Sequence, residues 1–92
     1  MAKAVFFNVL RDATGTPEIE IAPECKTVAQ AIEWLLARFE RLGEKLLADE
    51  GGRLRGGVAV LLDGKKIAPE EFERKQLGPK GELSFFEIIG GG

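Results

Sequence analysis

The hydrophobic positions of this chain follow a two-residue period near both ends and a helical period between them. Residues 3–10 (KAVFFNVL) are rich in β-branched and aromatic side chains, which predicts a first strand with Val5, Phe7 and Val9 on one face. Residues 13–17 (ATGTP) have turn chemistry, and residues 18–21 (EIEI) alternate cleanly. The first 21 residues are therefore expected to form a hairpin.

A long amphipathic helix is predicted to follow. Thr27 with Gln30 three residues later is a capping-box pattern, which satisfies backbone donors at a helix start. Gly43 is expected to end the helix, and residues 44–49 could add a short helical turn. Apolar side chains recur on one helix face at Val28, Ala31, Ile32, Leu35, Phe39 and Leu42.

The C-terminal half predicts three more strands. Residues 58–62 (VAVLL) suit a central strand, and Asp63-Gly64 is a dipeptide that type I′ hairpins favour. Residues 65–67 would return as an edge strand protected by its lysines. One helical turn is expected at 68–72 and a turn at 77–81, before the last strand near 83–89.

The element order β-β-α-β-β-β predicts an α+β fold, because one amphipathic helix must bury its apolar stripe against one face of a sheet. This is the ubiquitin-like β-grasp architecture, a mixed five-stranded sheet wrapped on one main helix. The first and last strands are both strongly apolar, so we expect them to lie adjacent and parallel at the sheet centre. The predicted domain covers residues 1–89, and residues 90–92 form a flexible glycine tail.

Composition narrows the function. The chain has 92 residues, 45% of them apolar, and a formal charge of 13 − 15 = −2, without a sustained basic stripe. These properties predict one cytoplasmic domain that binds neither nucleic acid nor membrane. The sequence has no histidine and only Cys25, which argues against a histidine-based catalytic or metal site. Cys25 is expected to be a tolerated loop residue.

The chain ends in three consecutive glycines, directly after an apolar strand. Glycine has no Cβ, so a Gly90-Gly91-Gly92 tail could enter a narrow adenylation site and present the α-carboxylate of Gly92. A carboxylate is a poor acyl donor until ATP converts it to an acyl adenylate. Because the chain has no P-loop, a partner would bind the ATP. The alternative for the tail alone is a frayed end.

Two segments resemble the MoaD and ThiS group of ubiquitin-like sulfur carriers, and MoaD most closely. Residues 5–16 (VFFNVLRDATGT) look like the first strand and turn of that family, and residues 82–92 look like its closing strand and tail. The resemblance implies that Gly92 is adenylated by a ubiquitin-activating-type adenylyltransferase and becomes a thiocarboxylate. It also implies that Gly91 and Gly90 thread the tail into the large subunit of molybdopterin synthase, with no permanently bound cofactor.

The residues before the tail keep alternatives open. MoaD-type tails often carry a Pro-Pro pair where this chain has Glu87-Ile88, and the apolar residue before the glycines also resembles the ThiS type, which serves thiazole synthesis. Related carriers feed cysteine synthesis or tRNA thiolation, and some archaeal members are attached to lysines of other proteins. The final sulfur acceptor therefore stays open at this point.

The last strand also predicts a surface for a partner. If Leu83 and Phe85 face the helix, strand alternation places Phe86 and Ile88 on the opposite face, where with Phe6 they would form a partner-docking patch.

Residues 53–57 (RLRGG) reproduce the letters of the end of ubiquitin, but they lie mid-chain without a free carboxylate and are expected to form a loop. Arg11 and Asp12 are assigned no chemistry.

Overall fold

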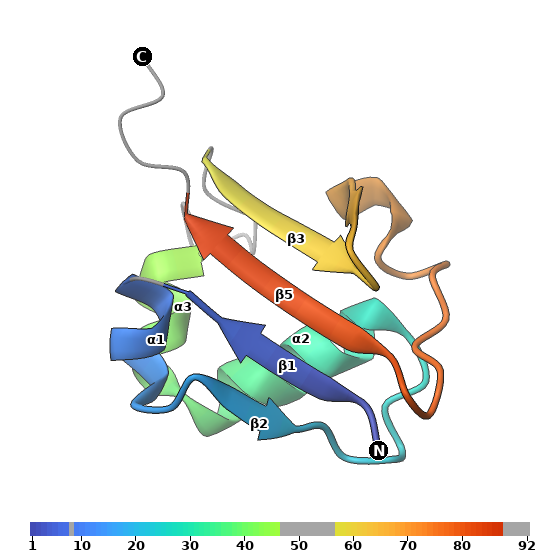
Figure 1. Ribbon diagram of the computed structural model, residues 1–92, viewed down its shortest axis with the longest axis horizontal. Helices are drawn as coiled ribbons and strands as arrows, with labels where there is room; N and C mark the ends of the chain where they lie inside the picture. The colour runs from blue at the N-terminus through green and yellow to red at the C-terminus, as the bar shows by residue number, and fades with distance from the viewer. Residues whose placement is uncertain (8, 47–56, 88–92) are drawn as a thin grey trace.

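The computed structural model of the protein describes residues 1–7, 9–46 and 57–87 (Figure 1). Five strands, three α-helices and one 3₁₀ turn make up the described chain. In order, they are β1 (Lys3–Phe6), α1 (Val9–Thr14), β2 (Glu18–Glu20), α2 (Val28–Arg38), α3 (Glu40–Leu46), β3 (Val58–Leu62), β4 (Lys65–Ile67), η1 (Pro69–Glu71) and β5 (Glu82–Glu87).

The strands form one mixed sheet in the order β2-β1-β5-β3-β4. β1 and β5 pair in parallel at its centre, with Phe6 opposite Phe85, and all other pairs are antiparallel. Helix α2 crosses behind the sheet in Figure 1. The predicted β-grasp fold and the central parallel pair are therefore confirmed.

The core lies between the sheet and α2. Phe6 and Phe85 are almost fully buried, and their rings stack with centroids 5.4 Å apart. Phe39 meets Phe6 edge-on at 6.3 Å, a geometry that aromatic rings favour. From α2, the buried side chains are those of Val28, Ala31, Ile32 and Leu35. These four belong to the predicted apolar stripe.

The start of α2 is fixed by the predicted capping box. Thr27 accepts a hydrogen bond from the backbone N–H of Gln30, and the Gln30 side chain accepts one from the backbone N–H of Thr27. The backbone N–H groups of Val28 and Ala29 donate to carbonyls of Lys75 and Phe72. Donors that a helix start leaves unpaired are thereby satisfied.

The first strand differs from the prediction. It ends at Phe6, and residues 9–14 form α1 instead of a strand end and a turn. The inward residues are Ala4 and Phe6, whereas Phe7 is exposed, so the expectation that Phe6 lies on the outer face was wrong. Leaving the sheet after Phe6 allows Leu10 to be fully buried from α1. Gly15, at φ 76°, closes α1 with its N–H donating to the Arg11 carbonyl.

The predicted single helix is also corrected. It ends at Arg38, Phe39 is extended with φ −122° and ψ 94°, and a second helix, α3, begins at Glu40. Gly43 lies inside α3 and does not end the helix. The break redirects the chain so that Leu42 and Leu46 are both fully buried.

The C-terminal half follows the predictions closely. Asp63 and Gly64 have φ values of 51° and 86°, as a type I′ turn requires, and β4 is an edge strand. β3 pairs on both sides, with β5 and β4. The helical turn predicted at 68–72 is η1, and the Gly81 N–H donates to the Gly78 carbonyl in the predicted turn before β5.

The corrected face of β1 can be tested by comparing two neighbouring phenylalanines. We expect Phe6→Ala to lower the free energy of unfolding by about 3–5 kcal/mol, because it empties a fully buried ring site. Phe7→Ala should cost only about 1 kcal/mol, the scale of one exposed ring pair. Urea denaturation of both variants measures the difference. Equal losses would contradict the register described here.

Candidate functional site

The predicted reactive end lies outside the described residues. This applies to Gly90, Gly91 and Gly92 and to the predicted docking residue Ile88, so their roles stay predictions. The structure does describe the strand that leads to them. β5 is the central strand of the sheet, and Glu87 is its last residue. The site is therefore built from β5 and its two neighbouring strands.

An apolar surface lies on the side of the sheet opposite α2, next to the charged pair of Lys3 and Glu82. In the register of β1, β5 and β3, Val5 and Leu61 lie beside Ser84, and Ala59 lies beside Phe86. Residues that lie side by side on adjacent strands share a face of the sheet. In Figure 1, β1, β5 and β3 face the viewer while α2 lies behind them. We call this surface the outer patch; its members are Val5, Phe7, Ala59, Leu61 and Phe86.

Two stacked rings lie in the outer patch, at the C-terminal ends of β1 and β5. The Phe7 and Phe86 rings have centroids 4.3 Å apart and are nearly parallel, at 6°. Phe86 is half-buried, and Phe7 is 38% exposed, one of two large hydrophobic side chains classed as exposed in the described chain. The pair stands one residue before the end of β5. It is an apolar contact site beside the base of the tail.

The composition of this patch corrects one prediction. Phe86 lies on the predicted face, but Phe6 is 1% exposed and belongs to the core. Phe7 takes its place because β1 has the opposite phase from the one expected. A one-residue error in strand phase exchanges the two faces of a strand. The parallel register of β1 with β5 was the signal that could have identified Phe7 as a residue of the outer patch.

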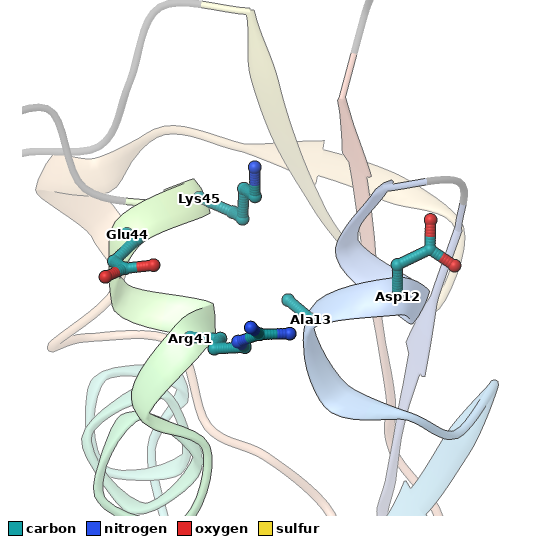
Figure 2. A pocket seen from close by; sticks show the side chains of 5 residues that line it. All are labelled: Asp12, Ala13, Arg41, Glu44 and Lys45. Atoms are coloured by element: carbon teal, nitrogen blue, oxygen red, sulfur yellow. The ribbon is translucent and has the colours of Figure 1, made fainter.

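A cleft of about 370 Å³ separates α1 from α3. Figure 2 shows Arg41 extending from α3 toward Ala13 on α1, with Asp12 across the gap. Glu44 and Lys45 complete the described lining, so two acidic and two basic side chains balance in formal charge. This balance favours neither an anion nor a cation. The cleft therefore gives no ground for assigning chemistry to Asp12.

Cys25 is a free and buried thiol between β2 and α2. It lines an apolar pocket of about 320 Å³ with residues that include Ala2, Ile21 and Pro79. Burial raises the pKa of the Cys25 thiol, and the neighbouring Glu24 carboxylate raises it further. A raised pKa lowers the thiolate fraction at neutral pH, which makes Cys25 a poor nucleophile.

The described ranges offer no other built-in chemistry of these kinds. They contain no group of three or more acidic, cysteine or histidine residues that could hold a metal ion. Nor do they contain a helix long and apolar enough to cross a membrane. Of the RLRGG segment, only Gly57 is described, an exposed residue at φ 94° that leads into β3.

Comparison with known proteins places the whole chain in one family. The ThiS family model matches residues 4–92, and the chain belongs to the ThiS family, whose members include ubiquitin-like sulfur carriers and modifiers. A search of curated proteins found no match.

Solved structures with the same fold carry several functional names. SAMP1 from Haloferax volcanii superposes with a TM-score of 0.83 at 21% identity, over 99% of this chain and 98% of that chain. The small archaeal modifier protein 1 from Methanosarcina acetivorans gives 0.80 at 25%, over 99% and 95%. A Pyrococcus furiosus protein provisionally assigned as molybdopterin converting factor subunit 1 gives 0.71 at 23%, over 96% and 97%.

The assignment of Cys25 as an inert thiol predicts slow chemical modification. At pH 7.5, iodoacetamide should alkylate Cys25 in the folded protein at least about tenfold more slowly than in urea-unfolded protein, because burial and the raised pKa both suppress thiolate attack. The rate should increase as the pH rises. Intact-mass measurements follow the reaction, and equal rates in the two states would show an accessible, reactive thiol.

Proposed function

We propose that this protein is a sulfur carrier whose C-terminal Gly92 is converted to a thiocarboxylate. The observation that carries the proposal is the family match over residues 4–92, which includes the complete glycine tail. The chemistry fits the chain, since its described part offers a poorly nucleophilic thiol and no metal-ligand cluster. The protein would act as a substrate of its partners and not as a catalyst.

Activation would follow ordinary carboxylate chemistry. An oxygen of the Gly92 carboxylate attacks the α-phosphorus of ATP held by a ubiquitin-activating-type enzyme, and pyrophosphate leaves. A sulfur nucleophile then attacks the acyl carbon of the adenylate and AMP leaves. When that nucleophile is the persulfide of a sulfur donor, the product is an acyl disulfide; a thiol then attacks the donor's own sulfur in the S–S bond, so that a disulfide forms on the donor and the thiocarboxylate leaves. ATP is thus a substrate of the activating partner, and this chain keeps no cofactor.

The fold explains how a partner would hold the tail. Residues 88–92 can span at most about 18 Å even when fully extended, so the Gly92 carboxylate must stay near the end of β5. A partner that binds the carboxylate must therefore cover the surface around Glu87. The outer patch, with Phe7 and Phe86 beside that point, offers an apolar docking surface there.

For the sulfur acceptor, we propose molybdopterin synthesis, with this chain as the small subunit of molybdopterin synthase. The fold shared with the Pyrococcus furiosus protein supports this assignment, as does the resemblance at residues 5–16. The large subunit would receive the tail and build the dithiolene of the cofactor from a cyclic pterin precursor. Thiamine, cysteine or tRNA thiolation uses the same thiocarboxylate and differs only in the acceptor.

A second candidate function is conjugation to other proteins. It is favoured by the structural similarity to two small archaeal modifier proteins. The activated Gly92 carbonyl would then be attacked by a lysine amine, with an isopeptide bond as the product. Covalent adducts of this chain with larger proteins in extracts of its own cells would favour this function over sulfur transfer.

Deletion of Gly92 tests the proposed reactive group. With the activating enzyme, ATP and a sulfur donor, the wild-type chain should gain the mass that corresponds to exchange of one oxygen for sulfur. The deletion variant should gain none, and its thermal unfolding midpoint should be unchanged, because Gly92 lies beyond β5. Gly78→Ala is the matched glycine control, since an added Cβ there meets no atom within 4 Å. Thiocarboxylate formation by the deletion variant would refute the proposal.

The docking role of the outer patch predicts a separation of binding from stability. Phe86→Ala and Phe7→Ala should each weaken association with the large subunit about tenfold or more, because each removes half of a stacked apolar contact. Phe72→Ala, at a half-buried aromatic in the turn after η1, is the control and should leave binding unchanged. Titration calorimetry measures the affinities. Unchanged binding by both patch variants would exclude this surface.

A further inference from the structure

Glu87 breaks the hydrophobic pattern of the central strand. Leu83 and Phe85 point to the core and are fully buried, and period-two alternation places Glu87 on the same face. On the neighbouring strand, the residues opposite these three are Leu62, Val60 and Val58, all apolar and in or against the core. Glu87 is thus the one charged side chain in this described row of two strands.

One oxygen of the Glu87 carboxylate is shielded from water, and no described residue replaces the hydrogen bonds that water would donate. Its Oε2 atom is buried, and no described residue donates a hydrogen bond to it or forms an ion pair with it. Native proteins rarely leave a buried polar atom unpaired, because a shielded carboxylate oxygen loses its water without gaining another donor. An apolar residue would suit this position better for stability alone.

The location of this unfavourable group points to a partner. Glu87 is the last residue of β5, next in sequence to the stacked Phe86 and five residues before Gly92. β1 has already left the sheet there, since its pairing with β5 ends at Phe6 and Phe85. Among the residues that the structure describes, no strand therefore pairs with Glu87 on the side away from Val58. A charged residue at a position where the strand pattern calls for an apolar one is typical of a functional site.

We propose that Glu87 is a positioning residue that accepts a charge-assisted hydrogen bond from an arginine or lysine side chain of the activating enzyme. This inference rests on the proposed function. The activating enzyme is the relevant partner because sulfur transfer and protein conjugation both begin with adenylation of Gly92. A cation supplies the half-buried Glu87 carboxylate with the charge and the donor that no described residue provides. The contact would fix the base of the tail while the outer patch holds the opposite face of β5.

The test compares Glu87→Gln with Glu82→Gln in the full chain. Glu82 is on the same strand but on the other face, and it pairs with Lys3 at 3.6 Å. Pyrophosphate release by the activating enzyme, measured against carrier concentration, gives KM and kcat. We expect Glu87→Gln to raise KM about tenfold or more, with kcat within twofold, because a neutral amide removes the charge pair. Glu82→Gln should stay within twofold in both, and raised salt should narrow the difference.

Stability separates a positioning role from a structural one. Glu87→Gln and Glu87→Leu should unfold at the same or a higher urea concentration than the wild type, since no pairing with a described residue is lost. A lower unfolding midpoint would show that another part of the chain neutralises Glu87 and would overturn the inference. An unchanged KM would also overturn it. If the wild type itself released no pyrophosphate, the proposed function would fail first, which keeps the two failures distinct.

Discussion

The parallel pairing of β1 with β5 is the contact on which the rest of this structure depends. The two strands lie near opposite ends of the sequence, and every other element lies between them in the chain. Their pairing stacks Phe6 on Phe85 in the core and Phe7 on Phe86 on the outer surface. Parallel strands need a crossover connection, and here the connection is nearly the whole domain. The core therefore closes only when the tail-bearing strand is in place.

This arrangement gives β5 two different faces. Toward α2, its side chains complete the hydrophobic core, and toward the opposite side they join the outer patch. The tail begins from a strand that is hydrogen-bonded on both sides along most of its length, so its starting point is held by the most buried part of the sheet. A partner that binds the outer patch would thereby meet a tail of fixed origin. Rigid support at the base of the tail is what the proposed sulfur carrier would require.

Much of the fold could be predicted because local chemistry agreed with the final structure. The Thr27–Gln30 capping box and the Asp63-Gly64 turn are formed by neighbouring residues, so they appear directly in the sequence. The phase of β1 could not be predicted in the same way. Residues 3–10 are apolar on both faces, and only the register with β5 selects Phe6 as inward and Phe7 as outward. The break at Phe39 likewise depends on long-range packing, which buries Leu42 and Leu46.

The candidate site likewise contains residues that local sequence predicts and residues that only long-range packing identifies. Phe86 was predictable once β5 was recognised as a strand, whereas Phe7 followed only from the register. The sequence shows Glu87 where MoaD-type tails often carry a proline, but only the folded sheet shows that its Oε2 atom is buried. The glycine tail itself remains a prediction from sequence, supported by the family match through residue 92.

The central claim is tested most directly by the mass of the wild-type C-terminal peptide from protein isolated from its own cells. Tandem mass spectrometry of that peptide can locate a modification at single-residue precision. We expect a fraction of molecules in which one oxygen of the Gly92 carboxylate is replaced by sulfur. A C-terminal peptide found only as the free carboxylate, under conditions in which the cells make sulfur-containing cofactors, would contradict it.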